Sequence, residues 1–207
     1  MIIAITGSIG SGKSAAGEIA ARAGAFVVDT DFLAKELQAE GTEGARLIKA
    51  LFGESFYEGG FLNRKALGRE VFSNPESLNK LNNIMHPLIY DAMLKKFEAA
   101  RKDGYKLIFG LVPLLFESGE KWPGCFDGVW IVAASEETCV RRVMSRDKCT
   151  AADAKQRIAA QMPLSKKLEY AQKLSIPVTI IENDNGEAKL YKQVMKALKP
   201  YKKLLAK

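Results

Sequence analysis

MIIAITGSIGSGKS, residues 1–14, is the stretch of this chain that decides its fold. Residues 1–6 are mostly apolar and predict a buried strand, and residues 7–14 fit the pattern G-x-x-x-x-G-K-[ST]. Glycines let such a loop turn tightly and point its N–H groups at phosphate oxygens, while the next helix adds the positive end of its dipole. Residues 13–23 are compatible with a helix, so the motif has the strand-to-helix context of a phosphate-binding loop.

Each polar group of this loop has an expected role. Lys13 is expected to reach the β- and γ-phosphates of a nucleoside triphosphate, and the Ser14 hydroxyl is expected to bind Mg²⁺. The residues expected to bind the nucleoside triphosphate at this loop are Gly7, Ser8, Ile9, Gly10, Ser11, Gly12, Lys13, Ser14 and Ala15.

The same residues contain a second pattern. Gly10-x-Gly12-x-x-Ala15 fits the dinucleotide fingerprint G-x-G-x-x-[GA], and Asp29 and Asp31 follow near the position of a ribose-binding acid. A lysine and a serine directly after the last glycine favour the triphosphate, because each has a phosphate or metal role there. Binding of a nicotinamide dinucleotide is the less favoured alternative.

The composition is that of a soluble globular protein with one domain and insertions. The chain has 207 residues, of which 47% are hydrophobic and 27% charged. It has no run of about eighteen apolar residues and no basic region at its start, so we expect neither a membrane span nor a secretory signal. Cys125, Cys139 and Cys149 are widely spaced and His86 is the only histidine, which argues against disulfides or a zinc site and for a cytoplasmic location.

The net charge of +7 is concentrated at the C-terminal end. Residues 188–207 contain no acid and account for the whole excess. Their lysines are Lys189, Lys192, Lys196, Lys199, Lys202, Lys203 and Lys207. The lysines largely follow helical spacing opposite apolar residues, which predicts an amphipathic helix with a solvated basic face. We therefore expect no nucleic-acid or membrane partner, and a non-catalytic nucleotide-binding module that uses this helix to bind RNA or a membrane is the alternative.

Five short apolar runs predict buried parallel strands, separated by helical segments. The runs are residues 2–6, 25–29, 106–112, 128–133 and 178–181. This alternation predicts an α/β fold with a five-stranded parallel sheet flanked by helices.

Two long insertions interrupt the alternation. Residues 33–103 contain no convincing strand and predict several helices, with breaks at 53–60, 74–75 and 86–87. Residues 136–175 predict one helix over 136–146 and another that a capping box at 150–153 opens. The arginines of this second insertion are Arg141, Arg142, Arg146 and Arg157. Arginines in such a place are typical of a mobile lid that closes over phosphates.

The expected domains follow from these insertions. The nucleotide-binding core comprises residues 1–32, 104–135 and 176–207, the helical substrate-binding insertion comprises 33–103, and the lid comprises 136–175.

Asp29 and Asp31 lie at the end of the second predicted strand. Ligands of open α/β sheets bind at the carboxyl ends of the strands, so both carboxylates are expected near the γ-phosphate. A carboxylate there can orient an acceptor hydroxyl or accept its proton, although an aspartate can also simply cap the next helix. A GTPase is disfavoured because the chain has no N-K-x-D motif.

Further motifs along nearly the whole chain resemble the dephospho-CoA kinase family. They are Asp29-Thr-Asp31, Leu62-Asn-Arg64, Ile84-Met-His-Pro87, Val112-Pro-Leu-Leu-Phe-Glu117, Phe126-Asp127, Arg142-x-x-x-Arg146, Arg157-Ile-x-x-Gln161, Lys167 and Asn183. Each is weak alone, but their order and spacing are specific. The chain departs from the family pattern at Ala15, Cys139 and Gln172, and we place the last two outside the reacting centre.

The resemblance implies a P-loop kinase fold with a helical coenzyme A insertion and a helical lid. It also implies transfer of the γ-phosphoryl group of ATP to the ribose 3′-hydroxyl of dephospho-CoA, the final step of coenzyme A synthesis, with Mg²⁺. The catalytic residues would be Lys13, Asp31 and Arg142, and Arg142 and Arg146 would also bind ATP as the lid closes. The substrate-binding residues would be Asp29, Asp31, Arg64, His86, Leu115, Glu117 and Arg157. We expect a monomer or weak homo-oligomer, and another small-molecule or nucleoside monophosphate kinase is the alternative enzyme.

Overall fold

A computed structural model describes residues 1–118 and 122–205 of the chain. Internal contacts divide it into two units, Met1–Asp29 with Lys96–Lys207 and, separately, Thr30–Lys95. Lys207, the last lysine of the predicted basic segment, lies outside the described residues.

A five-stranded parallel sheet forms the centre of the first unit. Its strands are β1 (Ile2–Gly7), β2 (Phe26–Asp29), β5 (Ile108–Leu111), β6 (Gly128–Ala133) and β7 (Val178–Glu182). Their order across the sheet is β2-β5-β1-β6-β7, and every neighbouring pair is parallel. All five predicted strands are present, with ends within two residues of the predicted ones, and the predicted fold class is confirmed.

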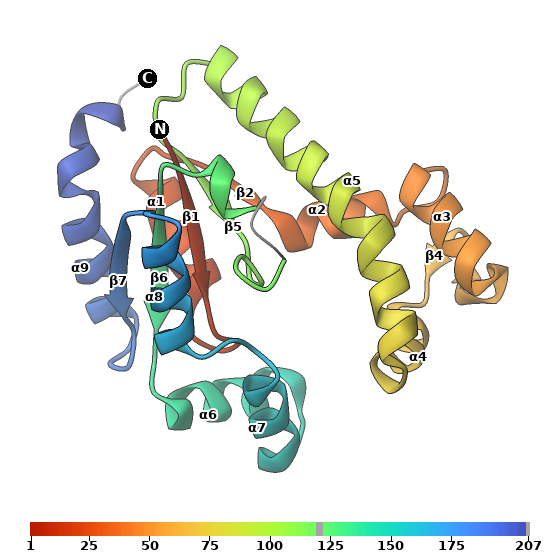
Figure 1. The fold of residues 1–207 in the computed structure, drawn as a ribbon. Helices are drawn as coiled ribbons and strands as arrows, with labels where there is room; N and C mark the ends of the chain where they lie inside the picture. Colours follow the sequence, from red (N-terminus) through yellow and green to blue (C-terminus); the bar gives the residue numbers. More distant parts are fainter. Residues whose placement is uncertain (119–121, 206–207) are drawn as a thin grey trace. The chain divides into compact units, whose positions relative to one another are not determined.

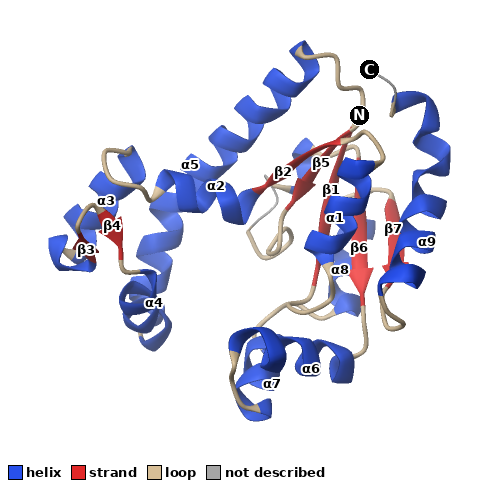
Figure 2. Ribbon diagram, turned by 180° about the vertical axis from the view of Figure 1, so that it is seen from behind, coloured by secondary structure: helices blue, strands red, loops and turns tan. Residues whose placement is uncertain are grey.

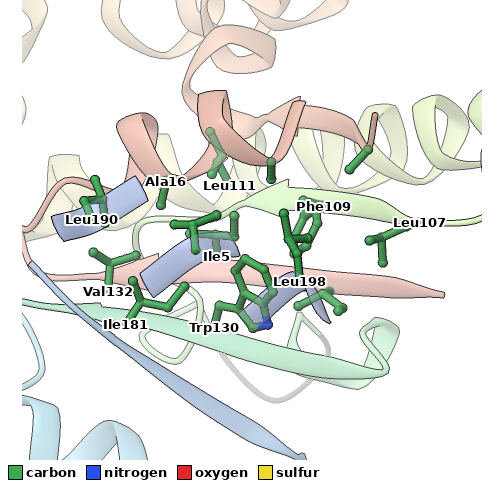
Figure 3. Close-up of a cluster of buried hydrophobic side chains, with 14 residues drawn as sticks. Ile5, Ala16, Leu107, Phe109, Leu111, Trp130, Val132, Ile181, Leu190 and Leu198 are labelled. Carbon is green, nitrogen blue, oxygen red and sulfur yellow. The ribbon is translucent and has the colours of Figure 1, made fainter. Parts of the chain in front are cut away.

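Helices α1 (Lys13–Arg22) and α9 (Glu187–Leu198) cover one face of this sheet. Figure 3 shows the side chains of the strands and of both helices converging into one apolar cluster, in which the rings of Phe109 and Trp130 lie 4.6 Å apart. Helix α8 (Leu164–Lys173) lies on the opposite face, in front of the sheet in Figure 1 and behind it in Figure 2. Strands covered on both faces need apolar residues at successive positions, and β1, β5 and β6 in the middle of the sheet are such apolar runs. The edge strands β2 and β7 are only partly buried.

Helices α6 (Glu136–Asp147) and α7 (Ala151–Ala159) pack on each other near the end of β6. Ser135 caps α6, and Thr150 and Asp153 form the predicted capping box of α7. A small apolar cluster of Val140, Val143 and Ala154 joins the two helices, and the side chain of Ile9 from the phosphate loop packs against it. The segment predicted as a lid therefore rests on the loop in this conformation.

The basic C-terminal segment has the predicted amphipathic form. Leu190, Val194 and Leu198 of α9 are buried in the sheet's core, while the lysines of residues 189–203 are exposed. The chain continues into the 3₁₀ helix η3 (Lys199–Leu204). Among the described helices, none combines the length and apolar composition needed to cross a bilayer.

The second unit is mainly helical, as predicted. It contains α2 (Thr30–Leu37), α3 (Glu43–Phe52), the short 3₁₀ helix η1 (Glu54–Phe56), α4 (Arg64–Ser73) and the first part of α5 (Pro75–Lys102), which continues into the first unit. The predicted breaks at 53–60 and 74–75 are confirmed.

Two details of the second unit were predicted wrongly. The expectation of no strand is wrong, because β3 (Tyr57–Glu58) and β4 (Phe61–Leu62) form an antiparallel hairpin (Figure 2). Its loop is Gly59-Gly60, with φ values of 56° and 84°, which suits a two-residue type I′ turn. Strands of two residues are too short to leave an alternating pattern in the sequence.

The predicted break at residues 86–87 is also wrong, because α5 runs through Pro87. A proline inside a helix removes one backbone hydrogen bond and costs about 3 kcal/mol. Met85, Ile89 and Met93, on both sides of the proline, are at most 8% exposed. Burial of these side chains offsets the local cost, so packing overrides the helix-breaking tendency of proline.

Candidate active site

Three glycines shape the phosphate loop between β1 and α1. Gly7, Gly10 and Gly12 have φ values of 147°, 80° and 100°, which disfavour any residue with a Cβ atom. A Cβ atom would lie 2.3 Å from the Val132 carbonyl oxygen at Gly7, and 2.1 Å from Nδ2 of Asn183 at Gly12. The loop is therefore pressed against the ends of β6 and β7, and glycine is required for space as well as for conformation.

The inner side of the loop suits an anion. Helix α1 begins at Lys13 with Gly12 as its N-cap, no side chain caps it, and no acidic residue lies in its first turn. The positive end of the helix dipole is therefore left to an external anion. Nζ of Lys13 donates to the carbonyl oxygens of Gly7 and Ser8, both at 3.0 Å, which holds the ammonium group along the loop.

Ser14 lies in the exposed first turn of α1, so its hydroxyl is accessible. The described residues contain no group of three or more His, Cys, Asp or Glu side chains able to hold a metal. A magnesium ion bound here would rest on the serine hydroxyl, phosphate oxygens and water, which is the ligand set that Mg²⁺ prefers beside a nucleotide. The residues present fit that ion.

Arg142 of α6 contacts the outer side of the loop. Its guanidinium group donates to the carbonyl oxygens of Gly10 at 3.2 Å, Ser11 at 3.3 Å and Asn183 at 2.9 Å. In this conformation Arg142 therefore holds the loop backbone, and its predicted movement toward the transferring phosphate stays a prediction.

Arg146 and Arg157 converge on one carboxylate. Asp147 accepts from Nε of Arg146 at 2.6 Å and from Arg157 at 2.8 Å. The hydrogen bond from Arg146, helped by the charge of Arg157, holds the pKa of Asp147 below its usual range. Both arginine side chains are at least half exposed, so they can exchange this partner for a phosphate at little cost.

Glu117 follows β5 at the same edge of the sheet. Its Oε1 accepts from the backbone N–H of Met162 at 3.0 Å and from Nζ of Lys167 at 3.1 Å. The side chain of Lys167 is only 1% exposed, so this ion pair neutralises a buried charge. Contact between Glu117 and a substrate stays a prediction beside this internal role.

Leu115 is completely buried, whereas its neighbour Leu114 is 42% exposed. The side chain of Leu115 is therefore covered in this conformation, and its contact with a substrate stays a prediction. A residue at the start of a loop is accessible or buried according to packing, which the local sequence does not specify.

Asp29 and Asp31 fall in different units. Asp29 is the last residue of β2 and pairs in register with Leu111 of β5. Since β5 lies between β1 and β2, Asp29 and Gly7 end strands that are about 10 Å apart at the same edge. Asp31 is exposed in the first turn of α2. A role of either carboxylate toward an acceptor stays a prediction.

The two predicted substrate contacts of the helical insertion both belong to the second unit. Arg64 begins α4 and donates to the side chain of Gln38 at 3.1 Å and to the carbonyl oxygen of Lys35 at 3.2 Å. His86 is partly buried in α5, and burial lowers its pKa. The histidine is therefore neutral at pH 7.

Cys139 packs on the phosphate loop through its backbone. A Cβ atom at Gly10 would lie 2.7 Å from the Cys139 carbonyl oxygen, so α6 packs directly on the loop at this residue. Burial raises the pKa of the Cys139 thiol, which keeps it protonated at neutral pH. The expectation that Cys139 and Gln172 lie outside the reacting centre stays a prediction, and Gln172 is exposed on α8.

Sequence reasoning gave no role to two residues that contact the loop. Gln161 accepts a hydrogen bond from the backbone N–H of Ile9 at 2.6 Å, and Nδ2 of Asn183 donates to the carbonyl oxygen of Ser11 at 2.7 Å. Asn183 follows β7 at the ligand-binding edge of the sheet, and that position was the available signal.

Comparison with known proteins agrees with this geometry. Residues 1–189 match a family model described as dephospho-CoA kinase. The chain is 36% identical over 196 residues to the dephospho-CoA kinase of Geobacter metallireducens, covering 94% of each protein. A crystal structure from Thermus thermophilus superposes with a TM-score of 0.79 at 34% identity, covering 97% of both chains. The dephospho-CoA kinase of Campylobacter jejuni gives 0.69 at 27% identity, covering 98% of this chain and 97% of that one. The chain belongs to the dephospho-CoA kinase family, the ATP-dependent transferases of the final step of coenzyme A synthesis.

Proposed function

We propose that this chain transfers the γ-phosphoryl group of MgATP to the ribose 3′-hydroxyl of dephospho-CoA. The observation that carries the proposal is the loop of residues 7–14, whose carbonyl side is held by the protein and whose uncapped helix end suits phosphate. Family membership supplies the acceptor.

In this mechanism the loop places the triphosphate and the chain supplies charge. The backbone N–H groups of the loop bind phosphate oxygens, and Lys13 leaves the carbonyls of Gly7 and Ser8 to follow the γ-phosphoryl group. Ser14 would hold Mg²⁺ through its hydroxyl. The ion would neutralise charge on the β- and γ-phosphates.

Asp31 orients the acceptor or takes its proton, and Asp29 binds the substrate beside it. The 3′-oxygen forms the new bond to phosphorus, the bond to the bridging oxygen of ADP breaks, and the hydroxyl proton passes to Asp31 or to water. Most of the catalytic effect comes from placing the two oxygens in line, because a loose phosphoryl-transfer state needs little proton abstraction.

In this mechanism Arg142 supports the loop, whereas Arg146 and Arg157 bind phosphates. Arg142 supports the loop from its carbonyl side and brings positive charge near the bound nucleotide. Arg146 and Arg157 bind phosphates of ATP and substrate when the lid of residues 136–175 closes, giving up Asp147 in exchange.

The helical insertion of residues 33–103 binds the dephospho-CoA. Arg64 is the candidate contact for its phosphates, and His86, neutral at pH 7, is the candidate for a polar contact. Glu117 and the loop around Leu115 contribute from the edge of the sheet. We further propose that the enzyme acts in the cytoplasm as a monomer or weak homo-oligomer, without nucleic-acid or membrane partners.

A substrate panel tests this function. Purified protein with MgATP and dephospho-CoA should release ADP and give coenzyme A, identified by mass spectrometry and by the 3′ position of the new phosphate. Nucleoside monophosphates should react poorly. Rapid phosphorylation of a nucleoside monophosphate with none on dephospho-CoA would reject the proposed acceptor. Asp31→Asn should lower kcat by at least about a hundredfold without changing the melting temperature.

A further inference from the structure

The backbone carbonyl groups on the outer side of the phosphate loop have hydrogen-bond donors of their own. A loop that turns its N–H groups inward to phosphates must turn its carbonyl groups outward into the protein, and buried carbonyls need donors. Ser11 is completely buried at this turn. Its carbonyl oxygen accepts from Nδ2 of Asn183 at 2.7 Å, the shorter of its two side-chain contacts, the other being Arg142 at 3.3 Å.

Asn183 is itself fixed by backbone bonds. It is the first residue after β7, and its N–H donates to the carbonyl oxygen of Ala133 at 2.8 Å, which extends the pairing of β6 and β7 by one residue. Its own carbonyl oxygen accepts from Arg142 at 2.9 Å. The residue is 5% exposed, so the side-chain amide has little freedom to move away from the loop.

The side chain of Asn183 also sets the position of Gly12. A Cβ atom at Gly12 would lie 2.1 Å from Nδ2 of Asn183, so the amide packs directly on the residue that caps α1. Gly12 precedes Lys13, the residue expected on the γ-phosphate. The side-chain amide of Asn183, at the edge of the sheet, therefore contacts Ser11 and Gly12, where the loop ends and α1 begins.

Asparagine suits this place better than its close relatives. The amide NH₂ group donates to the Ser11 carbonyl, while Oδ1 accepts from Arg142 at 3.4 Å. Aspartate has nearly the same shape but would turn an acceptor toward the Ser11 carbonyl oxygen. Alanine would leave that carbonyl without its shorter contact.

We propose that Asn183 is a positioning residue for phosphoryl transfer. It holds Ser11 and Gly12 so that the loop's N–H groups and Lys13 face the triphosphate, and it acts through the loop. The inference rests on the proposed function, since it requires that the loop of residues 7–14 binds MgATP.

The test compares Asn183→Ala and Asn183→Asp with Val194→Ala, a core truncation on α9 that leaves the loop's contacts intact. The expected result for Asn183→Ala is a dissociation constant for MgATP raised about tenfold, the usual effect of one well-made hydrogen bond. The KM for dephospho-CoA should stay within about twofold, because Asn183 contacts the carbonyl side of the loop and acts through the bound triphosphate. Asn183→Asp should lower the affinity for MgATP at least as much as Asn183→Ala does, although the side chain keeps its size. Val194→Ala should lose thermal stability while binding MgATP normally.

The outcomes separate this inference from the proposed function. Wild-type affinity for MgATP in both Asn183 variants, at a temperature where they are folded, would overturn the role of Asn183. A loss of MgATP affinity in Val194→Ala equal to that in the Asn183 variants would also overturn this role, because the effect would then follow the loss of stability alone. If Asn183→Ala does not fold, Asn183→Asp decides. Failure of the wild-type protein to bind MgATP would instead overturn the proposed function.

Discussion

Removal of Glu117 should destabilise the protein, because the buried ammonium group of Lys167 would lose its counter-charge. Lys167 is 1% exposed and Glu117 is 20% exposed, with 3.1 Å between Nζ and Oε1. In Glu117→Ala the lysine keeps its burial and loses its counter-charge, and the N–H of Met162 loses its acceptor. Stranding one partner of a buried ion pair costs about 3–5 kcal/mol, and water entering at the exposed side of Glu117 should hold the loss near the lower end.

This loss should appear as a melting temperature lowered by roughly 6–12 °C, since each kcal/mol shifts a domain of this size by about 2–4 °C. Lys167→Met removes the buried charge and leaves Glu117 partly hydrated, so its loss should be about 1 kcal/mol. The double variant Glu117→Ala with Lys167→Met should recover most of the stability that Glu117→Ala loses. Calorimetry and urea unfolding of the four proteins complete the cycle.

The cycle can refute the reasoning directly. If the double variant is as unstable as Glu117→Ala alone, the loss does not come from an unpaired lysine. If Glu117→Ala keeps the wild-type melting temperature and loses only affinity for dephospho-CoA, Glu117 serves the substrate and its contact with Lys167 contributes nothing measurable.

Three further changes probe other parts of the account. Gly12→Ala should lower MgATP affinity by at least about a hundredfold, because the new methyl group meets Asn183 at a positive φ of 100°, and near-normal affinity in calorimetry would contradict this. Burial lowers the pKa of His86, so the unfolded state binds more protons just below pH 6.5 and the wild-type protein should lose stability as the pH falls through this range. Between pH 7.5 and 5.5, urea unfolding should show a smaller loss of unfolding free energy in His86→Gln than in the wild type. An equal loss in the two proteins would show that His86 is not its source. Arg157→Ala should change stability by less than about 1 kcal/mol because its ion pair is half exposed, whereas kcat or KM should change if it binds phosphate; no kinetic change would exclude that role.

The sequence allowed the sheet to be predicted because its central strands β1, β5 and β6 are buried along nearly their whole length. Each of these central strands is a nearly continuous apolar run. The hairpin at residues 57–62 was missed since two-residue strands have no periodicity to detect. The helix through Pro87 was missed because its continuity depends on the burial of Met85, Ile89 and Met93, which local sequence does not report.

In the candidate site too, residues that form a local motif could be predicted, whereas contacts between distant segments could not. The loop of residues 7–14 is contiguous in the chain, and its chemistry could be predicted from spacing alone. Asn183 and Gln161 contact the loop from 172 and 152 residues away, so the motifs that contain them did not show that either residue touches the loop. The burial of Leu115 and the pairing of Glu117 with Lys167 likewise depend on packing between distant segments.

Titration of MgATP into the wild-type protein and into Lys13→Ala, followed by calorimetry, tests the central claim most directly. We expect saturable binding at one site in the wild type and a dissociation constant raised at least about tenfold in Lys13→Ala, since a charged contact to phosphate is lost. No saturable heat with the wild type, or equal affinity in the two proteins, would contradict the claim that this loop holds the triphosphate.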